Sequence, residues 1–271
     1  MTMNIPYIAE LYIYPIKSCG AISLQSVKTD KYGLQHDRQW MIINKNNEFL
    51  TQRELPILSL IIPSIKDDQL TITLPDTSTQ SLPMYAESGT IIQTQVWDDE
   101  VLVHDCGDEI ASFLSEYCQQ NVRLVKIGSL FSREVQSGII DFTTEVGFAD
   151  SYPLLLISQL TLDDLNSRLL SPIPMNRFRP NIVINGGSAY QEDHWRKLRT
   201  ENNTVLHFGK RCSRCVITTI DQSTAISGKE PLKTLASYNR DHRGRVMFGS
   251  YWAYQEYGNT LRVGDTVSVI E

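Results

Sequence analysis

The sequence contains no long apolar run and no excess of basic charge. No stretch of its 271 residues approaches the roughly 20 apolar residues that a membrane-spanning helix needs. The first residues, MTMNIPYIAELYIYPIKS, lack the basic start and the long apolar block of a signal peptide. The formal net charge is −6, so no overall positive field attracts the phosphates of nucleic acids. We therefore expect neither a membrane protein nor a nucleic-acid-binding protein.

Cysteine is scarce, and its number and spacing argue against a disulfide framework. The sequence has an odd number of cysteines, scattered along the chain as Cys19, Cys106, Cys118, Cys212 and Cys215. Disulfide-rich secreted domains are shorter and carry paired cysteines at close spacing. We therefore expect a reducing cytoplasm as the location. Each cysteine is then either a small buried apolar residue or a thiol with a chemical task.

Short β-branched and apolar runs predict many strands and few helices. Strands are expected over 7–16, 57–63, 70–75, 90–97, 100–106, 122–127, 151–158, 179–186, 204–209, 215–221, 246–255, 260–265 and 266–271. A hairpin is expected over 38–50, with its turn at 44–47. Helices are expected over 107–118, 161–170 and 231–238, where apolar periodicity or an early proline favours them. The pattern predicts a mixed α/β, β-dominated protein with a barrel-like arrangement.

One mixed segment separates two strand-rich parts of the sequence. Residues 127–149 contain glycine and serine without a clear period, so we expect a linker or crossover loop there. A chain of 271 residues is near the size at which one hydrophobic core gives way to two. We therefore predict two domains, 1–126 and 150–271, on either side of this segment.

The segment KRCSRCVITT, residues 210–219, places two cysteines three positions apart among basic residues. A thioredoxin-type dithiol begins a helix, whereas the β-branched run after Cys215 predicts a strand. A structural zinc site needs four ligands, and neither a second CxxC nor a pair of histidines at ligand spacing accompanies this one. Lys210, Arg211 and Arg214 favour a thiolate at Cys215 and attract an anionic ligand. For Cys212, a buried structural thiol is an equally good interpretation.

Other basic residues stand where predicted strands meet loops, namely Lys17, Arg38, Arg177 and Arg179. Lysine and arginine in such positions, with serine or glycine nearby, can hold a phosphate group. The sequence contains no GxSxG, P-loop or GxGxxG motif. A hydrolase nucleophile and a nucleotide-binding loop of these types are therefore not predicted.

Five segments together resemble the MOSC-domain proteins, in particular those with an N-terminal MOSC β-barrel extension. The segments are YPIKSCG (14–20), FRPNIVI (178–184), AYQEDHW (189–195), KRCSRCVITTID (210–221) and LRVGD (261–265). The resemblance spans residues 5–126 and 150–270 and is to the mitochondrial amidoxime-reducing component and its bacterial relatives. It implies a MOSC β-barrel domain preceded by a β-barrel-like MOSC extension.

The resemblance also implies a molybdenum–molybdopterin cofactor, with Cys215 as both the thiolate ligand of the metal and the residue at the reacting centre. A soft thiolate suits such a metal, and coordination removes the thiol proton. The positions that match the family's cofactor-holding residues are Lys17, Ser18, Arg38, Ser151, Arg179, Ser213, Arg214 and Tyr251. Where relatives have a Thr-Ser pair before a proline, this chain has Ser151 and Tyr152, so a cofactor contact by Tyr152 is left open. Pyridoxal phosphate is not implied.

The implied activity is reduction of N-hydroxylated substrates (amidoximes, hydroxylamines and N-hydroxylated purine bases) by oxygen-atom transfer to molybdenum. Electrons are expected from a separate donor protein of the ferredoxin-, flavodoxin- or cytochrome b5-type with its reductase, because no cysteine follows Cys215 and no membrane anchor is recognised. Two alternatives stay open. One is a carrier of the cofactor or of persulfide sulfur without reductase turnover, and the other is a thiol sensor built on Cys212 and Cys215.

Overall fold

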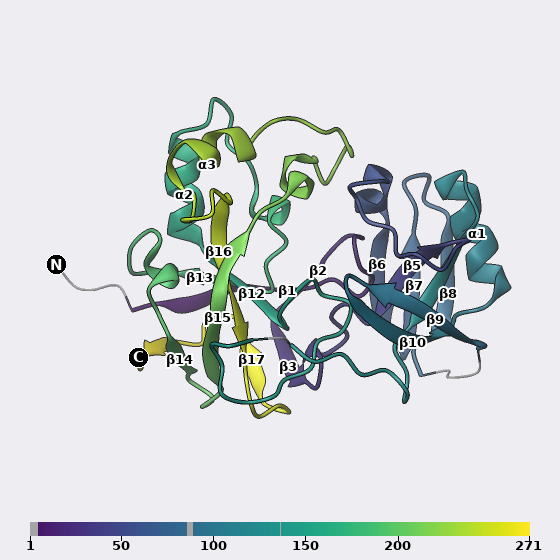
Figure 1. Ribbon diagram of the computed structural model, residues 1–271, viewed down its shortest axis with the longest axis horizontal. Coiled ribbons are helices and arrows are strands. Elements are labelled where there is room, and N and C mark those ends of the chain that lie inside the picture. The colour runs from purple at the N-terminus through teal and green to yellow at the C-terminus, as the bar shows by residue number, and fades with distance from the viewer. Residues whose placement is uncertain (1–4, 86–88, 136) are drawn as a thin grey trace.

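The computed structural model describes residues 5–85, 89–135 and 137–271, which form two lobes lying side by side (Figure 1). Strands dominate both lobes. The α-helices of the described residues are α1 (Asp108–Cys118), α2 (Gln159–Ser167) and α3 (Leu232–Tyr238). Within these ranges, no helix is long and apolar enough to cross a membrane. The predicted mixed α/β, β-dominated class is confirmed.

The larger lobe is built on an eight-stranded sheet with the order β18-β14-β15-β16-β12-β13-β1-β2. Its strands are β1 (Tyr7–Ile13), β2 (Ile22–Leu24), β12 (Leu154–Ser158), β13 (Ile182–Asn185), β14 (Lys197–Thr200), β15 (Val205–Ser213), β16 (Met247–Ala253) and β18 (Val267–Val269). Neighbouring strands are antiparallel except β12 and β13. The backbone N–H of Val267 donates to the carbonyl of Pro6, which joins β18 to the start of β1 and closes the sheet on itself. A three-stranded sheet of β3 (Ser26–Asp30), β4 (Gly33–Leu34) and β17 (Thr260–Arg262) completes the wall.

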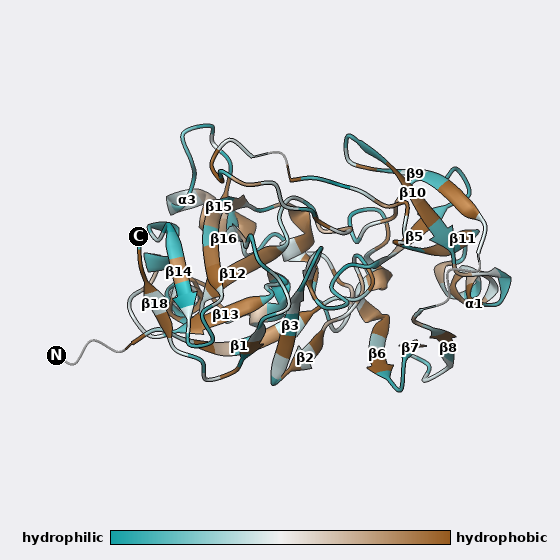
Figure 2. Cartoon of the chain, turned by 90° about the horizontal axis from the view of Figure 1, so that it is seen from below, coloured by the Kyte–Doolittle hydropathy of each residue, from teal (hydrophilic) through white to brown (hydrophobic). Residues whose placement is uncertain are grey.

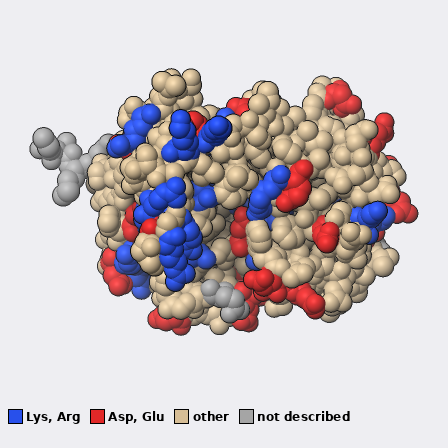
Figure 3. All heavy atoms as spheres, turned by 45° about the horizontal axis from the view of Figure 1, so that its top comes forward, with Lys and Arg blue, Asp and Glu red and all other residues tan. Residues whose placement is uncertain are grey.

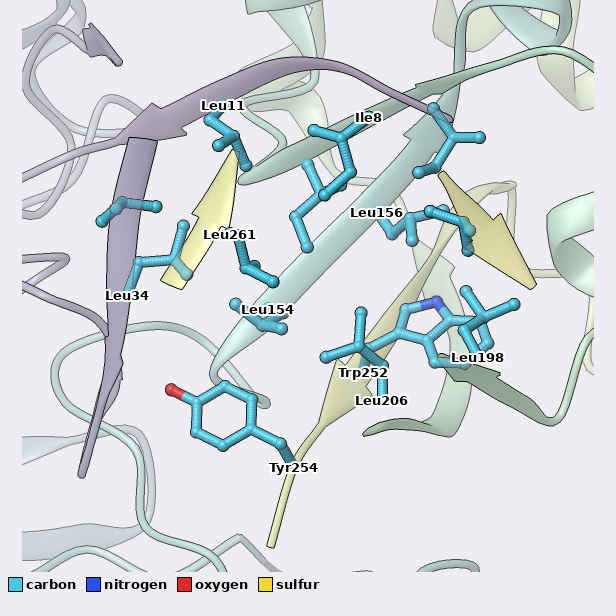
Figure 4. Close-up of a cluster of buried hydrophobic side chains, with 14 of the residues drawn as sticks. Ile8, Leu11, Leu34, Leu154, Leu156, Leu198, Leu206, Trp252, Tyr254 and Leu261 are labelled. Carbon is cyan, nitrogen blue, oxygen red and sulfur yellow. The ribbon is translucent and has the colours of Figure 1, made fainter. Parts of the chain in front are cut away.

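Both faces of the central strands are buried. Leu154 and Leu156 of β12 lie inside the barrel with Trp252 (Figure 4). Leu155 and Ile157 belong to a second cluster on the outer face, beneath α2 and α3. Successive side chains of a strand point to opposite faces, so the unbroken apolar run of β12 is what a strand covered on both sides requires. Figure 2 shows the hydrophobic colour concentrated on these strands and the hydrophilic colour on many of the loops.

The smaller lobe packs two sheets and α1 around its own cores. One sheet has the order β5-β11-β10-β9 and the other β6-β7-β8. The strands are β5 (Trp40–Asn44), β6 (Ile62–Lys66), β7 (Gln69–Thr73), β8 (Thr79–Pro83), β9 (Ile91–Val96), β10 (Asp99–Asp105) and β11 (Val122–Lys126). Trp40 and Ile42 of β5 pack with Leu114 of α1, whereas Met41 and Ile43 belong to a separate cluster on the opposite face.

Residues 127–149 carry the chain between the lobes without a named helix or strand in their described part. Phe131 and Phe148 of this segment are buried in the smaller lobe. The buried guanidinium of Arg133 bonds to Asp99 of β10 at 2.7 Å and to the carbonyl of Ala149 at 2.6 Å, which ties this part of the segment to the smaller lobe. Because β1 and β2 lie in the larger lobe, the domain limits at 126 and 150 stay a prediction. Residues 1–4 of the predicted first domain lie outside the described residues.

Two strand predictions are wrong in part. Residues 56–60 form a 3-10 helix, η1 (Pro56–Leu60), and the strand begins only at Ile62. Proline favours the first turn because its φ is already helical and it has no N–H to satisfy. Residues 216–219 form the 3-10 helix η4 (Val216–Thr219) instead of a strand. There the hydroxyl of Thr219 donates to the carbonyl of Val216 at 2.7 Å, a local bond that competes with extended backbone. Two further 3-10 turns are η2 (Met175–Arg177) and η3 (Gln191–Asp193).

Candidate functional site

A cleft where the two lobes meet brings together most of the residues singled out from the sequence. Its lining includes Lys17, Ser18, Arg38, Tyr152, Arg179, Ser213, Arg214, Cys215 and Tyr251. These residues come from segments near both ends and the middle of the chain. Ser151 does not line the cleft, although its neighbours Asp150 and Tyr152 do. The structure therefore gathers every predicted site residue except Ser151.

The cleft is cationic although the chain as a whole is acidic, with a net charge of −6. Six lining side chains are basic and one is acidic: Lys17, Arg38, Arg53, Arg177, Arg179 and Arg214 against Asp150. On the face shown in Figure 3, lysine and arginine gather over the left part and acidic side chains spread over the right part. A concave surface lined by one sign of charge concentrates ligands of the opposite sign. The cleft is suited to an anionic ligand.

Three of the predicted site residues have a left-handed backbone. The φ angles are 70° for Ser18, 47° for Arg38 and 56° for Arg179. Residues other than glycine seldom adopt this conformation, which costs about 1–2 kcal/mol for an L-residue. Such residues are concentrated at functional sites, where the surrounding contacts hold them in place.

The buried ring of Tyr14 holds two of the cleft's guanidinium groups in position. The guanidinium carbons of Arg38 and Arg179 each lie 4.3 Å from the centroid of this ring. Arg38 also bonds to the Asp37 carboxylate and, at 2.9 Å, to the Asn181 Oδ1. Burial raises the pKa of Tyr14 to about 12, so its hydroxyl stays a donor, bonded at 3.1 Å to a backbone carbonyl. The sequence analysis missed Tyr14, Asp37 and Asn181, although Asn181 belongs to the FRPN segment.

Lys17 is buried at the cleft and paired with Asp150. Its Nζ donates to Asp150 Oδ1 at 2.6 Å and to the Phe148 carbonyl at 2.7 Å. Burial lowers the pKa of Lys17, and the Asp150 carboxylate offsets part of that shift. Desolvation opposes ionisation of Asp150, but the Lys17 ammonium outweighs it and lowers the pKa of Asp150 to about 2.

The two cysteines of the CSRC segment have different surroundings. Cys212 is 1% exposed and packs in the core outside the barrel, whereas Cys215 is exposed and lines the cleft at the start of η4. Both thiols are free. The strand predicted after Cys215, which disfavoured a dithiol, is a 3-10 helix in the structure. Burial, instead, distinguishes the two thiols, since only Cys215 can meet a ligand in the cleft.

Cys212 is hydrogen-bonded to two residues that line the cleft. Arg214 Nη1 donates to the Cys212 Sγ at 2.7 Å, and the Tyr251 hydroxyl is also hydrogen-bonded to Cys212. Burial raises the pKa of Tyr251, so its hydroxyl is protonated at neutral pH. The ring of Tyr251 stacks on that of Tyr152, with centroids 5.8 Å apart. Tyr152 therefore belongs to the cleft wall.

Two guanidinium groups of the cleft keep unused hydrogen-bonding capacity. The buried Nε atoms of Arg177 and Arg214 have no hydrogen-bond partner in the described part of the chain. Among the same residues, no carboxylate forms an ion pair with Arg179 or Arg214. A buried donor without a partner is costly, so acceptor atoms of a ligand bound here would remove an existing penalty.

The side chains of the cleft suit a metal whose other ligands come from a bound cofactor. Within the described ranges, no three histidine, cysteine, aspartate or glutamate side chains gather where they could hold a metal ion. The cleft offers one accessible thiol, Cys215, surrounded by guanidinium and hydroxyl groups. One soft ligand plus an anion-binding cradle suits a metal held by an anionic organic cofactor. The residues present therefore fit a molybdopterin-type group.

Two family models together match most of the chain. The MOSC N-terminal beta barrel domain matches residues 5–121, and the MOSC domain matches residues 143–268. Mitochondrial amidoxime-reducing component 1 of Mus musculus is 35% identical over 281 residues, covering 97% of this chain and 82% of the mouse protein. Component 1 of Homo sapiens is 33% identical over 280 residues, with 97% and 82% covered. Component 2 of Bos taurus is 32% identical over 277 residues, with 96% and 82% covered.

Similarity to solved structures is weaker. The YUAD protein from Bacillus subtilis aligns with 98% of this chain and 97% of its own, at 10% identity and a TM-score of 0.39. A Bordetella bronchiseptica protein solved in solution aligns with 43% of this chain and 88% of its own, at 19% identity and a TM-score of 0.36.

Proposed function

The chain belongs to the MOSC-domain family with an N-terminal MOSC β-barrel domain, and from this membership we propose that it is a molybdenum-cofactor-dependent reductase of N-hydroxylated compounds. The observation that carries the proposal is the accessible Cys215 thiol in a cleft lined by six basic side chains. The relatives that match 96–97% of the chain are named amidoxime-reducing components. The proposed substrates are amidoximes, hydroxylamines and N-hydroxylated purine bases.

In this proposal, different residues of the cleft bind different parts of the cofactor. Cys215 provides the thiolate to the metal, because a soft sulfur suits it. Arg179 and Arg214 have no carboxylate partner among the described residues and bind the phosphate, which the guanidinium fork matches in shape. The partnerless Nε of Arg214 supports a ligand acceptor at that place. Ser18 and Ser213, which also line the cleft, add hydroxyl groups.

When bound, the cofactor supplies two-electron oxygen-transfer chemistry at an open metal position. The overall reaction turns an N-hydroxyl compound, two electrons and two protons into the amine or amidine and water. We assign no side chain as the acid, because Asp150, the one acidic residue of the described lining, is held ionised by Lys17 with a pKa of about 2. The contribution of the chain is to bind and orient substrate and cofactor.

We propose that a separate donor protein of the ferredoxin-, flavodoxin- or cytochrome b5-type, with its reductase, delivers the electrons. The described residues hold no cysteine cluster for a second redox centre, which supports an external donor. The cytoplasm stays our proposed location.

The test is a molybdenum measurement on protein purified from a host that makes the cofactor, followed by benzamidoxime and hydroxylamine reduction with an artificial electron donor. We expect near-stoichiometric molybdenum and conversion of both compounds. Bound molybdenum without reduction of either compound would favour the alternative, a carrier of cofactor or persulfide sulfur. Absence of molybdenum from such a preparation would contradict the proposal.

A further inference from the structure

A group of side chains from the smaller lobe adjoins the cleft and has no part in the proposed cofactor cradle. Its central member is Trp97, in the two-residue turn between β9 and β10, where Val96 pairs with Asp99. The φ of Trp97 is 58°, a left-handed value. Hairpin turns usually give such a position to glycine or asparagine, and a bulky side chain rarely adopts it. Observed strain of this kind at a cleft is grounds for a functional hypothesis.

Trp97 is the one tryptophan of the chain whose ring is open to solvent. Its exposed fraction is 40%, against 0% for Trp40, 4% for Trp195 and 0% for Trp252. The ring meets Phe49 edge to face, with the centroids 5.3 Å apart and the planes at 68°. This contact anchors the indole but leaves a large part of it uncovered. A role in packing alone does not account for so much exposed indole surface.

Two basic residues of the cleft lie against the same indole ring. The guanidinium carbon of Arg53 is 4.9 Å from a ring centroid of Trp97, and the Nζ of Lys17 is 5.9 Å from one. Both of these basic residues line the cleft that contains Cys215. Trp97 therefore borders the cleft through its direct neighbours. Figure 1 shows β9 and β10 in the smaller lobe.

Arg53 keeps hydrogen-bonding capacity for a ligand. Its Nη1 donates to the Thr51 Oγ1 at 3.3 Å, and no described carboxylate forms an ion pair with it. A guanidinium that lies against an indole offers a flat cation with donors at its edge, which suits a planar ring with polar substituents.

We propose that Trp97, with Phe49 and Arg53, forms a binding subsite for the planar aromatic part of the substrate. The exposed indole provides the surface on which a flat ring stacks, and Arg53 donates to the polar atoms of that ring system. The inference rests on the proposed function and narrows its substrate class. Among N-hydroxylated compounds, the subsite favours aryl amidoximes and N-hydroxylated purine bases over hydroxylamine, which has no ring to stack.

The kinetic test compares a ringed and a ringless substrate on the cofactor-loaded protein. For Trp97→Ala we expect the KM for benzamidoxime to rise about 10-fold, the size of a lost stacking contact, and the KM for hydroxylamine to change by less than about twofold. Trp97→Phe keeps a flat ring and should stay within about threefold of wild type for both. The matched control is Tyr257→Ala, which removes a surface aromatic that is 61% exposed in the larger lobe and should change neither value.

A binding test needs no turnover. Because the other three tryptophans are buried, acrylamide quenching of intrinsic fluorescence reports mainly on Trp97. Benzamidoxime should protect the wild-type protein from quenching, whereas hydroxylamine should not. If wild type reduces both compounds and Trp97→Ala affects them equally or not at all, the subsite is wrong. If wild type reduces neither, the proposed function fails, and the quenching result decides on the subsite alone: absence of protection overturns it.

Discussion

Two cations on each side of the cleft are held in different ways, although Arg53 of the smaller lobe has no ion pair among the described residues and Arg177 of the larger lobe is paired with Asp221 at 3.1 Å. Near the start of the chain, Lys17 is bonded to Asp150 and Arg38 to Asp37. On the larger lobe, Arg179 and Arg214 form no ion pair with any described carboxylate. Paired cations are oriented by the protein's own carboxylates, whereas Arg179 and Arg214 donate only to uncharged acceptors, and the Nε of Arg214 has no partner among the described residues. A basic residue beside a site is therefore not a ligand-binding residue by its charge alone.

The difference is also energetic. Burial lowers the pKa of Arg179, and the nearby Arg38 guanidinium lowers it further. The positive charge of Arg179 is therefore unfavourable in the folded protein when no anionic ligand is bound. A ligand that binds only the folded state stabilises it. The unpaired arginines therefore lower the stability of the cofactor-free protein and raise its affinity for an anionic ligand. For the paired side, the opposite holds: removal of a carboxylate there leaves a buried cation without its partner.

The largest effect expected is at the two cysteines. Cys215→Ser should abolish molybdenum binding and lower reductase activity by more than about 100-fold, the upper cost of losing a group that merely supports a metal ligand. Cys212→Ser should keep the metal, because Cys212 is buried outside the cleft. Metal analysis and benzamidoxime reduction measure both variants. Loss of metal from Cys212→Ser but not from Cys215→Ser would reverse our ligand assignment.

Next in size is the loss of a carboxylate from the paired side. Asp37 is 2% exposed, accepts the backbone N–H of Tyr14 at 2.7 Å and neutralises Arg38. Asp37→Ala should lower the free energy of unfolding by about 3 kcal/mol, because it leaves the Arg38 guanidinium uncompensated. Urea titration of cofactor-free protein measures this. A loss below about 1 kcal/mol would mean that Asn181 and the Arg179 carbonyl suffice to hold Arg38.

The unpaired side should respond in the opposite sense. Arg179→Ala should leave the unfolding free energy of cofactor-free protein unchanged or slightly higher, since it removes a desolvated charge beside Arg38. Cofactor retention should weaken by about 2 kcal/mol, or about 30-fold, from the loss of a charge-assisted bond. Molybdenum content after dialysis and urea titration give the two values on one variant. Unchanged cofactor content, or a stability loss as large as that of Asp37→Ala, would contradict the distinction between the two sides.

The smallest effect expected is a pH dependence at Asp150. Its pKa in the folded protein, about 2, lies below the ordinary 3.8, so the ion pair with Lys17 contributes stability above pH 4 that is lost as pH falls toward 2. Because this side chain is 48% exposed, solvent screening keeps the contribution under about 1 kcal/mol. Urea titrations at pH 5 and pH 3 should show a smaller difference for Asp150→Asn than for wild type. If wild type and Asp150→Asn lose the same unfolding free energy between pH 5 and pH 3, the lowered pKa of Asp150 is wrong.

Short-range patterns in the sequence predicted much of the fold, but they assigned strand to two 3-10 turns and left several short strands unpredicted, among them β3, β8 and β14. The strands with clear apolar runs and the three helices are where they are expected, for example β12 in its continuous LLLI run. The 3-10 helices at 56–60 and 216–219 were missed. Both stretches are apolar or β-branched, which favours a strand, but proline and threonine side-chain bonds decide the local backbone.

For the cleft, the family resemblance located residues that no local motif would have revealed. It joined Cys215 and its neighbouring cations to residues from distant segments, all of which line the cleft except Ser151, and it did not include Tyr14 or Asn181. Nothing in the local sequence marks Tyr14 as the ring between two guanidinium groups. That role exists only because Arg38 and Arg179, far apart in the chain, pack against it.

The amino-acid sequence alone is enough to predict the fold class, most of the secondary-structure elements and the family, because side-chain periodicity and motif spacing are local properties. It leaves the role of Cys212 open and cannot separate the paired cations from the unpaired ones. Those distinctions depend on burial and on partners such as Asp150, which lies 133 positions from Lys17. Desolvation and ion pairing arise only once the chain has packed, and they decide which thiol and which guanidinium groups face the cleft.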